Sequence, residues 1–130
     1  MNKKTIRVVA AIIIMDDKVL ACQRGYGEFK GKWEFPGGKI EVGETKEKAL
    51  IREIHEELSV DITIHKFLTN TKFSYDNFNL DMDSYICSIS KGKIDLKEHS
   101  SLKWLAKSDL NNIDWIAADI DIVNHLKKLL

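Results

Sequence analysis

The chain has 130 residues, close to the roughly 150 of an average domain, which favours one domain over residues 1–130. Its 20 basic and 20 acidic side chains cancel, which excludes the broad positive surface that holds a protein on duplex nucleic acid. With 44% hydrophobic and 31% charged residues, the composition excludes a disordered or collagen-like chain and is typical of a soluble globular protein.

Two strands are predicted first, over residues 6–15 and 18–24, where apolar and β-branched residues flank the acidic turn Asp16-Asp17. The longest apolar run, residues 8–15, is far shorter than the roughly 18 residues of a membrane span, so no membrane partner is expected. A secretion signal is the alternative interpretation of this run. Because the run is β-branched rather than Leu-rich and lacks a clear cleavage site, a buried strand is favoured.

Cys22 and Cys87 are the two cysteines, and each lies within an apolar, strand-like segment. This setting predicts small core side chains and not a disulfide framework. A cytoplasmic location is therefore the default expectation.

A glycine-rich segment follows the second strand. Residues 25–43 contain six of the seven glycines and the only proline, a density that indicates loops with special backbone geometry. The turn Pro36-Gly37-Gly38 lets the backbone approach a ligand closely, so that a main-chain carbonyl can complete a metal shell. We expect a binding site here.

A helix is predicted from Thr45 to about Leu58, with Thr45 as N-cap and Glu47 in the first turn. At about 100° per residue, its apolar side chains form one arc that we expect to pack on a sheet. They are Leu50, Ile51, Ile54 and Leu58.

Strands return after this helix, followed by a second helix. The predicted strands cover residues 60–68, 72–75, 80–89 and 102–105, with turns at residues 76–77 and at Gly92. A short helical turn over residues 108–111 precedes a final helix over residues 118–130, whose apolar residues share one face. The order of strands, helix, strands and helix predicts an α+β or layered α/β/α domain around a mixed β-sheet.

The first helix carries three carboxylates, Glu53, Glu56 and Glu57, on one flank, with Ala49 between them. The like-charge pairs each cost about 0.2–0.5 kcal/mol, and they lie near the helix C-terminus, where the dipole disfavours anions. One interpretation is a solvated acidic face. The other is a site for a hard cation such as Mg²⁺ or Mn²⁺, since the histidines and cysteines are too scattered for zinc.

Two cationic residues adjoin the glycine-rich segment. Arg24 ends the second predicted strand, and Lys39 follows the Pro-Gly-Gly turn. Taken singly, each is most simply a surface charge. Beside a metal held by carboxylates, however, such cations suit a polyphosphate bridged by divalent ions.

Gly38, Glu44 and residues 52–60 closely resemble the Nudix box, G-x5-E-x7-R-E-U-x-E-E-x-G-U, and residues 33–41 are similar to its MutT-type branch. The length and the order of elements agree with a single Nudix domain along the whole chain. One residue departs from the box, because Ser59 replaces the glycine that follows the helix. Serine adopts the left-handed conformation at a cost of about 1 kcal/mol, so we expect stability to be affected more than chemistry.

The resemblance implies a Nudix fold, with a mixed sheet between helices, and metal-dependent hydrolysis of a nucleoside diphosphate linked to another group. It implies a metal-binding set of Glu53, Glu56, Glu57 and the Gly37 carbonyl, with Mg²⁺ or Mn²⁺ as the cofactor. Glu98 resembles an extra acidic ligand that MutT-like enzymes supply from a loop. An exposed loop glutamate beside a lysine is the alternative.

Further roles follow from the resemblance. Glu53 is expected to orient or deprotonate water, and Glu44 and Arg52 to form an ion pair that holds the loop on the helix beside Gly38. Arg24 and Lys39 resemble phosphate-side contacts. The remaining residues expected at the substrate are Glu34, Phe35, Phe78 and Asp119.

Asp119 follows Ala118 near the start of the last helix, where MutT-like proteins read the base. Its carboxyl group can accept a hydrogen bond from a base edge or, if protonated, donate one; a helix N-terminal residue favoured by the dipole is the plain alternative. The MutT protein has an amide there, whereas related enzymes that prefer cytidine nucleotides have a similar Ala-Asp pair. Base selectivity therefore stays open.

We accordingly expect a pyrophosphohydrolase that converts a (deoxy)nucleoside triphosphate to a nucleoside monophosphate and pyrophosphate. Its expected role is the removal of oxidised nucleotides such as 8-oxo-dGTP, in the service of DNA repair. The alternatives are a hydrolase of CTP or modified dCTP and, further behind, of ADP-ribose or dinucleotides, or a nucleotide-binding sensor without hydrolysis. We expect a monomer or a homodimer.

Overall fold

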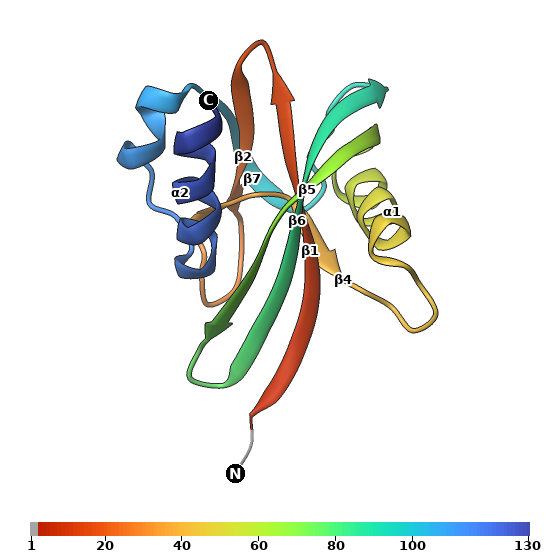
Figure 1. The fold of residues 1–130 in the computed structure, drawn as a ribbon, viewed down its shortest axis with the longest axis vertical. Helices are drawn as coiled ribbons and strands as arrows, with labels where there is room; N and C mark the ends of the chain where they lie inside the picture. Colours follow the sequence, from red (N-terminus) through yellow and green to blue (C-terminus); the bar gives the residue numbers. More distant parts are fainter. Residues whose placement is uncertain (1–2) are drawn as a thin grey trace.

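A mixed sheet of seven strands separates two helices in the computed structural model, which describes residues 3–130 (Figure 1). The strands are β1 (Lys4–Met15), β2 (Lys18–Arg24), β3 (Trp33–Glu34), β4 (Gly37–Lys39), β5 (Asp61–Ser74), β6 (Phe78–Lys91) and β7 (His99–Leu105). The helices are α1 (Lys46–Leu58) and α2 (Ile120–Leu129), with 3₁₀ turns η1 (Lys107–Asn112) and η2 (Ala117–Asp119).

The strand order is β3-β2-β1-β6-β5, with β4 paired to β1 and β7 paired to β2. The central pair, β1 and β6, is parallel, whereas β5 and β2 pair antiparallel with their neighbours. Asp16 and Asp17 join β1 to β2 with φ of 53° and 62°. Two successive positive φ values are typical of tight hairpins, whose twist matches that of the strands. The predicted mixed sheet is confirmed.

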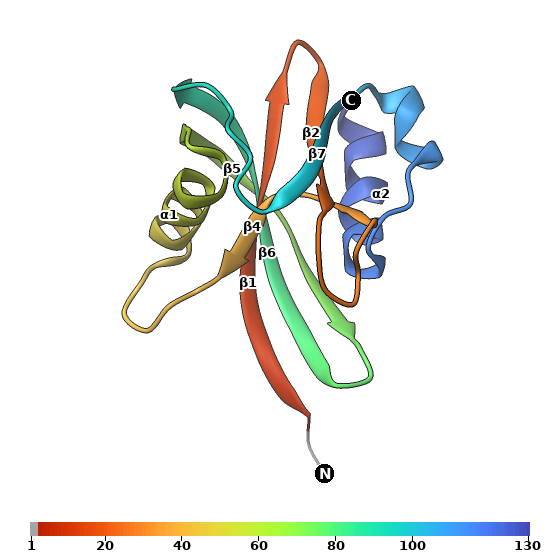
Figure 2. The same cartoon turned by 180° about the vertical axis from the view of Figure 1, so that it is seen from behind.

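α1 and α2 cover opposite faces of this sheet (Figures 1 and 2). Side chains alternate along β1, so that Val9 and Ala11 pack with α1 while Ala10 and Ile12 pack with α2. The first apolar run is therefore a buried strand. In residues 3–130 no helix has the length and apolar character needed to cross a bilayer.

Both cysteines are buried and free, and both belong to the core on the α1 side of the sheet. Burial raises the pKa of the Cys22 and Cys87 thiols to about 12. The prediction that they act as small core side chains is confirmed.

The two strands predicted over residues 60–68 and 72–75 are wrong as separate elements, because β5 is continuous. Pairing with β6 persists through the predicted gap, where the Asn70 amide donates to Asp81 Oδ1 and Asp83 Oδ1, both at 2.7 Å. Register shifts in the first half of β5, the last of them between Phe67 and Thr69, precede this stretch. The short strands β3 and β4 within the glycine-rich segment were not predicted.

The helix predictions need two corrections. Ile51, assigned to the core face of α1, is 41% exposed, whereas Ala49 on the acidic flank is fully buried. The reason is that β4 lies against the acidic flank, with Gly38 next to the Glu53 carboxylate, which shifts the buried face toward the glutamates. The last helix begins at Ile120, because residues 117–119 form a 3₁₀ turn.

The ends of α1 follow the sequence expectation. The Lys48 backbone N–H donates to the Thr45 hydroxyl at 3.2 Å, which makes Thr45 the N-cap. At the other end, Ser59 adopts the left-handed conformation, with φ of 60° and ψ of 28°, and its N–H donates to the His55 carbonyl. The serine therefore reproduces the turn that the box assigns to glycine.

Candidate active site

A cavity of about 450 Å³ lies where the glycine-rich segment meets β1, β7 and the start of α2. Most of the residues expected at the site line it: Arg24, Glu34, Phe35, Gly37, Gly38, Lys39, Glu57, Phe78, Glu98 and Asp119. Four of the expected residues lie outside the lining: Glu44, Arg52, Glu53 and Glu56. We call the part around Glu57 and β4 the α1 side of the cavity, and the part around Asp119 and Phe78 the α2 side.

Glu57, on the α1 side, is a carboxylate with three acidic neighbours and the weaker opposing charge of Arg24. Its Oε2 atom is buried and has no hydrogen-bond partner in the described part of the chain. Burial, followed by repulsion from the charges of Glu53, Glu34 and Glu98, raises the pKa of Glu57 to about 8. A nearby cation would lower the pKa of Glu57 and would give its buried oxygen a partner.

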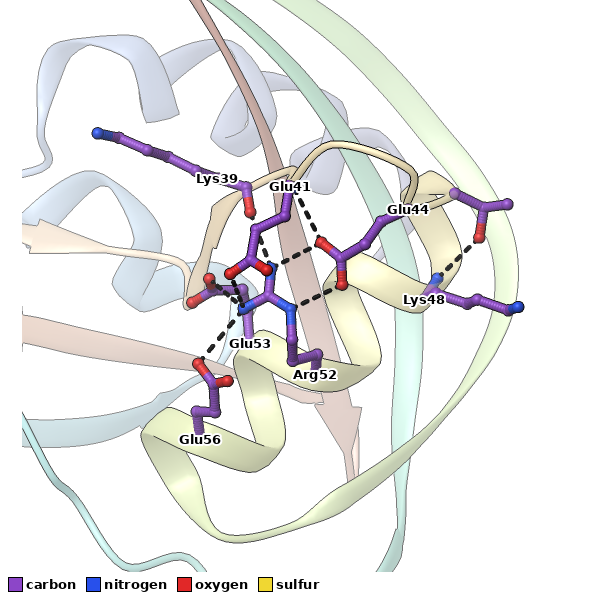
Figure 3. Close-up of polar contacts among 8 residues, drawn as sticks. Lys39, Glu41, Glu44, Lys48, Arg52, Glu53 and Glu56 are labelled. Carbon is purple, nitrogen blue, oxygen red and sulfur yellow. Dashed lines mark hydrogen bonds and ion pairs between the residues drawn. The ribbon is translucent and has the colours of Figure 1, made fainter.

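Arg52 lies among the other carboxylates, and Figure 3 shows its guanidinium between Glu44 and the pair Glu53 and Glu56. Its Nε and Nη2 donate to the two Glu44 oxygens at 2.7 and 2.9 Å, in a fork. This hydrogen bonding, with the Glu41 N–H that also donates to Glu44, lowers the pKa of Glu44 to about 2. The loop before α1 is thereby tied to the helix.

The same guanidinium reaches the catalytic candidates. Arg52 Nη1 donates to Glu53 Oε1 at 2.8 Å and to Glu56 Oε2 at 3.3 Å, while Nη2 donates to the Lys39 carbonyl at 3.1 Å. Within residues 3–130, no three acidic, histidine or cysteine side chains converge as a closed metal-binding group. Arg52 is the cation that contacts Glu53 and Glu56 in this arrangement.

The two glycines of the turn are required by close contacts. A Cβ at Gly38 would stand 2.4 Å from the Glu53 carboxyl carbon, and one at Gly37 would stand 2.0 Å from the Val9 carbonyl oxygen. Figure 2 shows β4 leaving the middle of the sheet toward the side of α1. Only glycine lets β4 pair with β1 while the Glu53 carboxylate lies against it.

A hard divalent cation fits these donors, because they are carboxylate and carbonyl oxygens and one carboxylate oxygen is buried without a partner. Glu98 lies at the rim, where the Tyr26 hydroxyl donates to its Oε2 at 3.2 Å. It contributes charge to this region, as its effect on the Glu57 pKa indicates.

Asp119 is the corresponding group on the α2 side and is only 4% exposed. Its Oδ2 accepts the Phe35 backbone N–H at 2.9 Å, and its Oδ1 has no partner within residues 3–130. Burial, with a smaller contribution from the charge of Glu34, raises the pKa of Asp119 to about 8. The group is therefore mostly protonated at neutral pH and carries a hydrogen that it can donate.

Aromatic rings surround this carboxyl group. Phe78 lies 5.0 Å from the Tyr75 ring, centroid to centroid, and the Tyr75 hydroxyl accepts the Ala118 backbone N–H at 3.1 Å. Phe35 stacks on Trp115 at 4.7 Å and is buried. The combination of flat apolar walls and a buried polar group is typical of a site for a planar heterocycle.

Glu34 lies between the two sides, since its charge affects the pKa of both Glu57 and Asp119. Its Oε1 accepts from Arg24 Nε at 3.1 Å, and its Oε2 from His99 Nε2 at 2.9 Å.

Among the residues that line the cavity, sequence reasoning missed Tyr26, Tyr75 and His99. Tyr75 ends a predicted strand just before a turn, a position where aromatic side chains are often part of the hydrophobic core. His99 had one signal, its position next to Glu98. Tyr26 lies within the glycine-rich segment itself.

The fold and this cavity are those of a hydrolase family. A NUDIX domain profile matches residues 4–126, so the chain belongs to the Nudix family. Nudix hydrolases cleave nucleoside diphosphates linked to another group and as a family require a divalent metal. The resemblance seen in the sequence is confirmed.

Relatives support this assignment along the whole chain. The Escherichia coli K12 protein named CTP pyrophosphohydrolase is 31% identical over 92% of this chain and 90% of its own length. A Mycobacterium tuberculosis H37Rv protein named putative 8-oxo-dGTP diphosphatase 2 is 32% identical over 95% and 89%. The solution structure of a MutT protein from methicillin-resistant Staphylococcus aureus 252 is similar with a TM-score of 0.78, at 39% identity over 99% and 100%.

Proposed function

We propose that this chain hydrolyses (deoxy)nucleoside triphosphates to a nucleoside monophosphate and pyrophosphate, with Mg²⁺ or Mn²⁺ as cofactor. The observation that carries the proposal is a single cavity with a carboxylate among acidic neighbours, Glu57, on one side and a buried, aromatic-lined carboxyl group, Asp119, on the other. Such a cavity suits a molecule with a metal-bound polyphosphate at one end and a base at the other.

The metal-binding residues in this proposal are Glu53, Glu56, Glu57 and the Gly37 carbonyl, with Glu98 from the rim. When bound, the ion supplies a Lewis acid that neutralises the phosphate charge and polarises a phosphoryl oxygen. Without the ion, Arg52 holds both Glu53, which lies against β4, and Glu56, which is exposed.

Glu53 is the proposed residue for the attacking water. Arg52 Nη1 binds Glu53 Oε1, which leaves Oε2 without a protein partner within residues 3–130. Oε2 can therefore accept a hydrogen bond from water and orient it or take its proton. Attack on a phosphorus of the chain then forms the P–O bond to water oxygen and breaks the phosphoanhydride bond, which releases the two products.

Arg24 and Lys39 are the proposed contacts to the phosphate chain. Both line the cavity, and Arg24 uses only Nε for its bond to Glu34. Its terminal nitrogens are therefore available to phosphate oxygens, where their charge stabilises the developing negative charge.

Asp119, with Phe78 and Phe35 near it, is the proposed base site. A protonated Asp119 donates to an acceptor on the base edge, and the backbone N–H of Phe35 keeps the carboxyl group oriented. We propose oxidised purines such as 8-oxo-dGTP as the preferred substrates. CTP or a modified dCTP is the second candidate, which the identity to the Escherichia coli CTP pyrophosphohydrolase favours.

The NUDIX match over residues 4–126 supports a single domain. We further propose that it acts on free nucleotides and not on nucleic acid, as a monomer or homodimer in the cytoplasm.

Pyrophosphate release tests the proposal, measured with Mg²⁺ and with Mn²⁺ on 8-oxo-dGTP, dGTP, CTP, dCTP, 5-methyl-dCTP and ADP-ribose. Glu56→Gln, in which an amide replaces a metal-binding carboxylate, is the control and should lose most activity. Preference for 8-oxo-dGTP supports a nucleotide-pool sanitiser, and preference for a cytidine nucleotide supports the second candidate. Binding without release at any metal concentration would instead indicate a nucleotide sensor.

A further inference from the structure

We propose that His99 is a positioning residue that keeps the Arg24 guanidinium open toward the nucleotide phosphate nearest the base. The inference rests on the proposed function, since it names the residue that prepares the phosphate-binding arginine of that site. Its basis is the three-membered chain His99, Glu34 and Arg24 in the middle of the cavity.

Glu34 is shared between two donors. Arg24 Nε donates to Oε1 at 3.1 Å and His99 Nε2 lies 2.9 Å from Oε2. The side chains of Glu34 and His99 are only 16% and 6% exposed, so water competes little for either bond. Both carboxylate oxygens are therefore occupied by protein donors.

Within residues 3–130, the His99 side chain makes no other polar contact. A carboxylate oxygen only accepts, so Nε2 is the ring nitrogen that carries the donated hydrogen. The second ring nitrogen, Nδ1, is buried without a partner in the described residues. The single polar task of this buried ring is thus to hold Glu34 Oε2.

The Arg52–Glu44 pair offers a comparison for the Arg24–Glu34 pair. At Glu44, where the second donor is the Glu41 backbone N–H and no histidine holds the carboxylate, the arginine donates through Nε and a terminal nitrogen in a fork, at 2.7 and 2.9 Å. At Glu34 the buried His99 ring holds Oε2 and fixes the orientation of the carboxylate, and Arg24 makes a single bond through Nε to Oε1. Neither terminal nitrogen of Arg24 has a partner within residues 3–130.

Three strands bring this chain of residues together. Arg24 ends β2 opposite His99 on β7, and a register shift separates this pair from Gln23. Glu34 reaches the same place from β3, which pairs with β2 at Cys22. Irregular pairing of this kind re-aims side chains next to binding sites.

A matched pair of variants tests the role. His99→Leu removes the donor and keeps an apolar side chain, whereas His99→Gln restores an N–H near the position of Nε2. We expect His99→Leu to let Glu34 take the Arg24 fork and to weaken binding of 8-oxo-dGMP or CMP, titrated without metal by calorimetry, about tenfold. His99→Gln should bind within about twofold of the natural chain.

Two further readouts separate positioning from a general structural effect. With the triphosphate as substrate, His99→Leu should raise KM with little change in kcat. The NMR signal of the Arg24 Nε–Hε group should shift in His99→Leu and return in His99→Gln. In an Arg24→Lys background, where no fork is possible, His99→Leu should cause no further loss of mononucleotide binding.

The proposal is overturned if His99→Leu binds like the natural chain, if His99→Gln fails equally, or if the Arg24 and His99 losses add. It is also overturned if the natural chain binds neither mononucleotide. These outcomes are distinct from failure of the proposed function, which shows as absence of pyrophosphate release while the mononucleotide results still follow the pattern above.

Discussion

Glu57 on the α1 side of the cavity and Asp119 on the α2 side both have a pKa of about 8, but the surroundings of the two groups differ. Burial is the largest cause in each case. Glu57 also faces the charges of three other glutamates and has a buried oxygen with no partner. Asp119 has one acidic neighbour, Glu34, and its Oδ2 is satisfied by a backbone N–H.

These surroundings imply that a cation would stabilise the charged form of Glu57, whereas the protonated form of Asp119 needs no cation. A bound divalent ion would relieve the repulsion around Glu57 and favour its charged form, whereas burial favours the protonated form of Asp119. Equal pKa values are therefore compatible with the two different roles proposed above, a metal ligand on the α1 side and a hydrogen-bond donor on the α2 side.

The largest effect is expected from Glu57→Gln. Loss of a metal-binding carboxylate should lower kcat for pyrophosphate release by about 100- to 1000-fold for every nucleotide tested, because charge stabilisation at the phosphate is lost. The isosteric change Asp119→Asn should leave kcat for the most slowly hydrolysed nucleotide within about tenfold of the value of the natural chain, because this side chain does not contact the phosphate chain. Equal losses of kcat in the two variants across all nucleotides would contradict the assignment of different roles to Glu57 and Asp119.

Stability should depend on pH through both groups. Their pKa values in the folded chain exceed the ordinary values of 4.5 and 3.8, so the native state holds more protons than the unfolded chain between about pH 4 and pH 8. The free energy of unfolding of the metal-free protein should therefore fall by about 2–4 kcal/mol per group as pH rises from 5 to 8.

Urea unfolding at several pH values measures this dependence. Saturating Mg²⁺ should remove the contribution of Glu57 and leave that of Asp119, and Glu57→Gln or Asp119→Asn should each remove its own part. A metal-free protein that is more stable at pH 8 than at pH 5 would show that neither group binds its proton in the folded state.

Base selectivity should change next in size and only on the α2 side. Replacing Asp119 with Ala removes the buried donor, and the ratio of kcat/KM for the preferred nucleotide to that for its unmodified counterpart should fall about 10- to 100-fold. Leu102→Val, which alters an apolar residue outside the cavity lining, is a suitable control and should leave the ratio unchanged. An unchanged ratio in Asp119→Ala would assign base selection to other residues.

Ser59→Gly should give the smallest effect and leave both sides of the cavity as they are. Ser59 has a φ of 60°, a conformation that glycine adopts more readily, so the free energy of unfolding should rise by about 0.5–1 kcal/mol. Thermal unfolding measures the gain, and kcat should not change. A loss of stability would mean that the serine hydroxyl contributes more than its backbone costs.

Much of the fold follows from local patterns in the sequence. The first two strands and α1 were predicted nearly to the residue, because apolar spacing, an N-cap threonine and an acidic turn mark their bounds. The continuity of β5 was not predicted, since pairing with β6 through Asn70 is a long-range contact. The buried face of α1 shifted for a similar reason, because β4 packs against the acidic flank.

The residues of the candidate site were likewise predicted only in part. The Nudix box names the residues of one helix and one loop, and most of those expected at the substrate do line the cavity. His99 and Tyr75 were missed because a register shift and three ring contacts, which no short motif encodes, direct them inward.

Arg52 also bears on the order in which the protein folds and binds metal. Because its guanidinium contacts Glu44, Glu53 and Glu56 and offsets part of their mutual repulsion, the acidic helix can form before any ion arrives. If Glu53 and Glu56 bind the ion, as we propose, folding and metal loading are separate events, and the arriving ion competes with a tethered positive charge for both carboxylates.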